Sequence, residues 1–113
     1  MTGEVDARVR AIATQLGFKT SIWTQGYDTN DWLIPAGIAI PQSVIDIFKG
    51  WLVNFRQLPT GFIVLQHDLF KEEVDVAVDG ILPIAYNSTN LVMQPIADCL
   101  GDSMPHKEDP ENF

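Results

Sequence analysis

The stretch Gly61-Phe62-Ile63-Val64-Leu65-Gln66-His67-Asp68-Leu69 decides the fold that we predict, because it is an unbroken apolar run that ends in a histidine and an aspartate. Short apolar runs rich in β-branched residues are typical of strands buried on both faces, and such strands occur in parallel sheets covered by helices. His67 is therefore expected at the carboxyl end of a strand, where α/β folds form their ligand sites. The alternative is that His67 fills a loop and bonds only to backbone.

Apolar residues at helical spacing predict a helix before this run, from Val5 to Leu16. Glu4 and Asp6 are placed for its first turn, and Gly17 is placed for its C-terminal cap. Phe18 to Trp23 then alternates between apolar and polar residues, which predicts a strand.

Two further helices are predicted on either side of the apolar run. One begins at Pro41, and its aromatic residues are expected in the core rather than in a binding site. The other begins near Phe70 after an Asp68 cap and is bent or ended at Pro83. The apolar faces comprise Val44, Ile45, Phe48, Trp51, Leu52 and Phe55 in the first, and Val74, Ala77, Val78, Ile81, Leu82 and Ala85 in the second.

The order of these elements predicts the fold class. Leu91 to Met93 reads as a third short strand, and Gln94 to Leu100 as a turn or short helix. Alternating helices and strands are typical of α/β proteins with parallel strands and outer helices. We expect one domain over residues 1–100 and a loose tail over residues 101–113.

The composition excludes several classes of partner. The formal net charge is -8 and no cluster of Lys or Arg is present, so neither nucleic acid nor an anionic membrane is expected as a partner. No apolar stretch is long enough to cross a bilayer, and no signal peptide is recognised at the N-terminus, which predicts a cytosolic chain as written. Cys99 is the only cysteine, so neither an internal disulfide nor a cysteine zinc cluster can form.

Two polar loops follow successive predicted strands and should lie side by side at one rim of the sheet. One contains Asp28, Asp31 and the large aromatic Trp32, and the other contains His67. A carboxylate beside an imidazole can hold its tautomer, as a general acid requires. An acid and a histidine at the rim of an α/β domain are also common without any catalytic role.

The same residues resemble the polysaccharide deacetylases with a NodB-homology domain. Asp28-Thr29-Asn30-Asp31-Trp32 resembles their Asp-x-x-Asp-Trp motif, and Leu65-Gln66-His67 resembles their Leu-x-His motif. The flanking sequence is similar to fungal chitin deacetylases in particular, including Gln94-Pro95-Ile96 and Cys99.

The resemblance implies the C-terminal half of a distorted (β/α) barrel and the metal-dependent hydrolysis of N-acetyl groups in an N-acetylglucosamine polymer such as chitin. By this match His67 is the acid that protonates the leaving amine, and Asp31 is the carboxylate that tunes it. Leu65 lines the pocket for the acetate methyl, Trp32 forms a wall of the sugar groove, and Asp28 has a supporting role. Complete family members are expected to be secreted or held at the cell wall.

The family's earlier motifs are missing: the Thr-Phe-Asp-Asp segment, the His-x-x-x-His segment and the Arg-x-Pro-Tyr segment. The family's zinc or other divalent metal is held by two histidines and one aspartate, and His67 and His106 cannot supply that site. We therefore expect no metal ligand in this chain. Gly3 stands about where the glycine after the Arg-x-Pro-Tyr segment falls, so the chain is expected to begin just downstream of that segment.

Three hypotheses follow for function. The chain completes a deacetylase site only when the other half is supplied, or it is a non-catalytic remnant that at most binds a chitin-like polysaccharide through Trp32. The third is a generic α/β interaction domain.

A half-barrel would also leave strand edges and helix faces uncovered, which predicts self-association. The resemblance implies that related secreted enzymes bridge a cysteine in this C-terminal segment to one in the absent half, so Cys99 is expected to be a free thiol.

Overall fold

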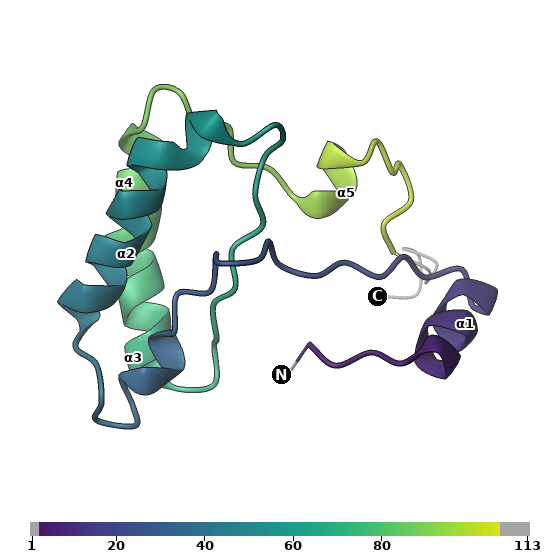
Figure 1. Ribbon diagram of the computed structural model, residues 1–113, viewed down its shortest axis with the longest axis horizontal. Coiled ribbons are helices and arrows are strands. Elements are labelled where there is room, and N and C mark those ends of the chain that lie inside the picture. The colour runs from purple at the N-terminus through teal and green to yellow at the C-terminus, as the bar shows by residue number, and fades with distance from the viewer. Residues whose placement is uncertain (1–2, 107–113) are drawn as a thin grey trace. The chain divides into compact units, whose positions relative to one another are not determined.

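The computed structural model describes residues 3–106 and places them in two compact units (Figure 1). The smaller unit combines residues up to Ser21 with residues from Val92 onward, and the larger unit runs from Ile22 to Leu91. The part of the predicted tail after His106 lies outside the described residues.

The smaller unit contains α1 (Ala7–Gln15) and α5 (Ile96–Cys99). The Asp6 carboxylate caps α1 by accepting a hydrogen bond from the Val9 amide at 2.9 Å, and Gly17 follows the helix at φ +79°. Lys19 Nζ and Asp102 Oδ2, which are 2.9 Å apart, join the two halves of this unit. The predicted first helix and the predicted short element near residue 96 are therefore confirmed.

The larger unit is built on α2 (Pro41–Asn54), which has Pro41 in its first turn as predicted. A short 3-10 helix, η2 (Phe55–Gln57), extends it. The predicted apolar stripe is confirmed, because Val44 and Phe48 are buried and the other stripe residues of α2 pack around them or are half-buried.

A second long helical segment, from residue 71 to residue 87, lies beside α2 (Figure 1). It consists of α3 (Lys71–Asp75), the π-helix η3 (Val76–Ile81) and α4 (Leu82–Asn87). The wide turn of η3 comes directly before Pro83, whose ring would clash with a carbonyl of a regular helix. The sequence predicts a bend or an end at Pro83, whereas the structure has a π-helical turn before Pro83 and the helix continues after it.

The wide turn changes which side chains of this segment are buried. The buried residues are Glu73, Val76, Ile81 and Ala85, whereas the predicted face members Val74, Val78 and Leu82 are exposed. A π-helical turn contains one residue more than a regular turn, so an apolar face counted at regular spacing falls out of phase. Only part of the predicted face is therefore correct.

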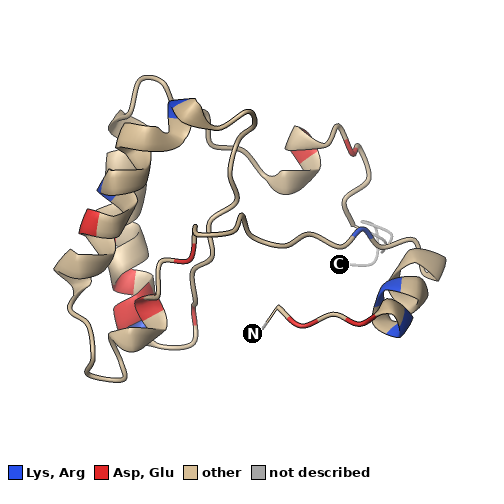
Figure 2. Cartoon of the chain, in the orientation of Figure 1, with Lys and Arg blue, Asp and Glu red and all other residues tan. Residues whose placement is uncertain are grey.

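The predicted N-cap of this segment is also wrong. Phe70 occupies the cap position, and its amide donates to the Glu73 Oε2 atom at 2.9 Å. Asp68 lies outside the helix and is exposed. The acidic first turn of α3 is confirmed, because Glu72 and Glu73 both lie in it, and Figure 2 shows the acidic residues gathered on this helix.

The predicted α/β half-barrel with parallel strands and outer helices is contradicted. Within residues 3–106 the β-pairing is one parallel bridge, between Asp28 and Leu65. Ile63, Val64 and Leu65 are half-buried, whereas the prediction placed them in a strand buried on both faces. The predicted strands at residues 18–23 and 91–93 find no strand partner in the described part of the chain, and Phe18, Ile22 and Val92 are exposed.

Within residues 3–106 no helix combines the length and the apolar character that a membrane span requires.

Candidate acid site

Two extended segments of the larger unit run in parallel and carry the predicted site residues. Thr24 donates its amide to the Ile63 carbonyl at 2.9 Å, and its hydroxyl accepts from the Ile63 amide at 2.8 Å. Further along both segments, the Leu65 amide donates to the Tyr27 carbonyl at 3.0 Å. The segments around residues 24–31 and 63–67 are therefore held in register by backbone and threonine hydrogen bonds.

An aromatic cluster covers these segments from α2. The ring of Tyr27 lies 5.0 Å from that of Trp51 and 4.6 Å from that of Phe62, measured between centroids. The rings of Phe48 and Trp51 are 6.1 Å apart in an edge arrangement. Aromatic pairs at these separations are favourable beyond the area they bury, so α2 fixes the position of both extended segments.

The loop from Asp28 to Trp32 is built by a local turn. Asp28 Oδ1 accepts a hydrogen bond from the Asn30 amide at 2.9 Å, and Asn30 has a left-handed backbone with φ +53°. Asparagine tolerates this conformation better than most residues. The 3-10 helix η1 (Asp31–Leu33) then begins, so the turn delivers Asp31 into the interior of the unit.

Asp31 and His67 lie together as the sequence predicts. Asp31 Oδ1 is 2.7 Å from His67 Nδ1, and Asp31 Oδ2 accepts a hydrogen bond from the His67 amide at 2.8 Å. An ionised carboxylate can only accept, so with Asp31 ionised this contact requires the proton on Nδ1 and leaves Nε2 for other contacts. Asp31 is fully buried, whereas the His67 side chain keeps 22% of its exposure. The alternative that His67 bonds only to backbone is excluded.

The other predicted site residues lie close to this pair along the chain, with different exposure. Trp32 follows Asp31 in η1 and is 47% exposed. Leu65 is half-buried, and both its amide and its carbonyl are used in pairing with the neighbouring segment. Asp28 acts on the shape of the loop through Asn30, which fits a supporting position.

Thr29 is a buried polar residue that the sequence reading did not single out. Its amide and its hydroxyl both donate to the Leu65 carbonyl, at 3.2 and 2.8 Å, and its side chain is fully buried. Its sequence neighbourhood does not mark it, apart from its place two residues before Asp31.

The residues described do not fit a catalytic metal. Among residues 3–106 no group of three or more His, Cys, Asp or Glu side chains is placed to hold an ion. Asp31 is fully buried, and both of its carboxylate oxygens contact His67 rather than a further His, Cys, Asp or Glu side chain among these residues.

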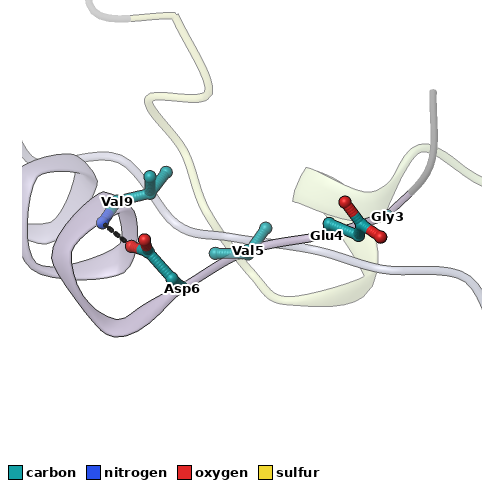
Figure 3. A pocket seen from close by; sticks show the side chains of 5 residues that line it. All are labelled: Gly3, Glu4, Val5, Asp6 and Val9. Carbon is teal, nitrogen blue, oxygen red and sulfur yellow. Dashed lines mark hydrogen bonds between the residues drawn. The ribbon is translucent and has the colours of Figure 1, made fainter.

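An open hollow is present in the smaller unit and carries none of the predicted site residues (Figure 3). It is lined by Gly3, Glu4, Val5, Asp6 and Val9. The amide of Val9, and next the side chain of Arg8, hold the pKa of Asp6 below its ordinary value. The contact between Asp6 and Val9 is the N-terminal cap of α1.

Comparison with known proteins gives several fungal relatives. The chain is 40% identical to chitin deacetylase 1 of Cryptococcus neoformans var. grubii over 108 residues, which is 88% of the chain and 23% of that protein. It is 36% identical to a chitin deacetylase of Amylomyces rouxii, over 96% of the chain and 25% of that protein. It is 32% identical to chitin deacetylase 2 of Saccharomyces cerevisiae, over 67% of the chain and 23% of that protein.

No protein-family model and no solved structure matches the chain. The chain spans about a quarter of the length of the curated relatives that it matches. The predicted resemblance to the fungal chitin deacetylases is confirmed, and the chain is related to them.

Proposed function

We propose that the chain carries the general-acid part of a polysaccharide deacetylase site, with His67 as the acid and Asp31 as the carboxylate that orients it. One observation supports this most strongly. A fully buried carboxylate holds both the ring and the backbone amide of a histidine that remains partly exposed. A structural carboxylate needs neither an imidazole partner nor a ring nitrogen left open to solvent.

The chemistry required is protonation of a leaving nitrogen. When the C–N bond of an acetamide breaks, the nitrogen must gain a proton or leave as a strongly basic anion. A doubly protonated His67 would donate its Nε2 proton to that nitrogen while Nδ1–H stays bonded to Asp31. A positioned acid of this kind contributes about 10²- to 10⁴-fold to the rate.

The substrate that we propose is a chitin-like N-acetylglucosamine polymer, which the names of the relatives support. Trp32, exposed directly after Asp31, would form a wall for a sugar ring. Leu65 would contact the methyl group of the acetyl substituent, and Asp28 would keep the loop in shape through Asn30.

We further propose that the chain by itself is not a complete catalyst. The family's divalent metal, commonly zinc, would supply polarisation of the amide carbonyl and an activated water. A catalytic zinc takes about three protein ligands. The residues described here do not fit such a site. Acid catalysis by His67 alone is too small a contribution to break an amide.

A second function is favoured by the exposure of Trp32. A large aromatic side chain that is 47% exposed beside a polar loop suits stacking against a sugar ring without any reaction. A non-catalytic chain that binds chitin-like sugar, or another partner, through this residue is therefore the alternative.

The test measures acetate released from chito-oligosaccharides in the presence of zinc or cobalt. The chain is assayed alone and together with the separately produced remainder of one of the curated relatives. We expect activity only in the mixture, and we expect it to be lost in His67→Gln and kept in His106→Gln. His106 is the matched control because it is the chain's other histidine and is exposed.

Release of acetate by the chain alone would contradict the proposed incompleteness. Equal activity of His67→Gln and the parent chain in the mixture would contradict the acid role. Binding of the oligosaccharide without activity in any mixture, lost in Trp32→Ala, would establish the binding alternative.

A further inference from the structure

We propose that Thr29 is the positioning residue that brings His67 into contact with Asp31. The alignment of the two segments is inferred from their contacts alone. Only the importance of this alignment for catalysis rests on the proposed function. Thr29 is fully buried and directs two donors, its amide and its hydroxyl, to one acceptor, the Leu65 carbonyl.

The position of this link along both segments supports the role. Thr29 stands two residues before Asp31, and Leu65 stands two residues before His67. Each segment therefore has the same short length of chain between the Thr29 link and the Asp31–His67 contact. If one segment were displaced along the other at Leu65, His67 would therefore be displaced relative to Asp31.

The Thr29 link is the last one before the pair. Thr24 and Tyr27 bond to Ile63 and Leu65 further back along the segments, and after Thr29 the next bonds between the segments are those of Asp31 to His67. Asn30 then turns the chain at φ +53°. The extended pairing of the two segments ends at this turn. We therefore assign to the buried Thr29 hydroxyl the role of keeping the two segments in register up to Asn30.

The threonine hydroxyl makes the shorter of the two bonds to Leu65, at 2.8 Å against 3.2 Å for the amide. Threonine to valine substitution keeps the shape and the backbone amide and removes only the hydroxyl donor. The Leu65 carbonyl then accepts a hydrogen bond from the Thr29 amide alone, and the alignment of His67 with Asp31 becomes less well fixed.

The experiment measures amide hydrogen exchange by NMR in the full chain, with His67 and Phe48 as reporters. The His67 amide is bonded to Asp31 Oδ2, and Phe48 is buried in α2 of the same unit. In Thr29→Val we expect exchange at His67 to be roughly threefold to tenfold faster, the effect of losing one hydrogen bond, with no matching change at Phe48. Thr29→Ser keeps the hydroxyl and should restore slow exchange.

Thr60→Val is the matched control, because Thr60 is exposed and its hydroxyl bonds only to the neighbouring Gly61 carbonyl. It should leave both reporters unchanged. Equal acceleration at His67 and Phe48 in Thr29→Val would show that Thr29 stabilises the whole unit, which overturns the positioning role. Unchanged exchange at His67, or failure of Thr29→Ser to restore it, would overturn it as well.

Because exchange is measured without substrate, the result is separate from the deacetylase proposal. Loss of the acid role in the acetate assay would leave the alignment by Thr29 intact, and failure of the exchange test would leave the acid role of His67 intact.

Discussion

Asp31 holds His67 at two points, because one carboxylate oxygen lies 2.7 Å from the ring Nδ1 atom and the other accepts the backbone amide at 2.8 Å. The ring and the backbone of the histidine are thus fixed by one buried group. This arrangement sets the tautomer of His67 and directs Nε2 away from the carboxylate.

Removal of the carboxylate should destabilise the larger unit. In Asp31→Ala the His67 amide loses its acceptor in a partly buried place, and such a loss costs about 1–3 kcal/mol. Urea unfolding measures the change. Asp68→Ala is the control, because Asp68 is exposed and outside any helix, and its effect should stay within about 0.5 kcal/mol. Equal effects of the two substitutions would contradict the buried contact.

Gly80 permits the close approach of η3 to α2. A Cβ atom at Gly80 would lie 2.7 Å from the Ile45 Cδ1 atom and 2.9 Å from Cγ1. We expect Gly80→Ala to lower the free energy of unfolding by about 1–3 kcal/mol through overpacking. The added substitution Ile45→Val removes the nearest atom and should recover part of that loss.

Gly50→Ala is the matched control for Gly80→Ala. Gly50 lies inside α2, and a Cβ atom there would meet no neighbour within 4 Å. Alanine is the better helix former, so Gly50→Ala should raise the free energy of unfolding by about 0.5–1 kcal/mol. A stabilising Gly80→Ala would mean that η3 does not pack closely on Ile45.

The helix α1 should lose stability in acid. The folded chain holds the pKa of Asp6 below the ordinary value of 3.8, through the Val9 amide first and Arg8 next. The charged cap therefore stabilises α1 above the unfolded-state pKa, and this stabilisation is lost as the pH falls through the lowered value. NMR shifts of α1 residues, followed from neutral pH into acid, report the change.

Asp6→Asn serves as the comparison, because asparagine keeps a side-chain acceptor at the cap and cannot titrate. The part of the acid transition that belongs to the cap should be absent in this variant. The same acid response of α1 in both proteins would contradict a charged cap.

The predicted self-association needs a different physical basis, since residues 3–106 do not form a half-barrel. Exposed apolar side chains recur at every fourth position of the segment that leads into and forms α3, η3 and α4: Phe70, Val74, Val78, Leu82 and Tyr86. Exposed apolar rows of this kind promote association.

Sedimentation velocity over a range of concentrations should show oligomers, and Val78→Lys should reduce the fraction of chains in oligomers. Val53→Lys, at an exposed apolar position of α2, should have a smaller effect. A monomer at every concentration would contradict the prediction.

Cys99 is exposed and is not in a disulfide. Titration with a thiol reagent should therefore find one reactive sulfhydryl per chain without denaturant, because an exposed thiol is accessible to reagent. Cys99→Ser should abolish the signal. A monomer with no titratable thiol would contradict this prediction.

The helices could be predicted from the sequence because each has a local signal. Pro41 marks the start of α2, and Gly17 marks the end of α1. The strands could not be predicted in the same way, because an apolar run such as Ile63 to Leu65 specifies an extended chain without specifying a partner. Whether a sheet forms depends on neighbours distant in sequence, and here the neighbour is a single extended segment.

The pairing of Asp31 with His67 could be predicted from the sequence, because both residues follow predicted extended segments. The contacts of Thr29 could not be predicted, because a lone threonine between Asp28 and Asn30 belongs to no recognised pattern. The burial of Glu73 was also missed, since its hydrogen bond to the Phe70 amide and the π-helical phase of the segment appear only in three dimensions.

The most direct measurement is nitrogen-15 NMR of the His67 ring in the parent chain and in Asp31→Asn, with His106 as the internal reference. We expect neutral His67 to carry its proton on Nδ1, with Nε2 unprotonated, and we expect Asp31→Asn to change this tautomer while His106 is unaffected. A His67 ring that carries its proton on Nε2 in the parent chain, or that is indifferent to Asp31→Asn, would contradict the pairing on which the proposed acid role depends.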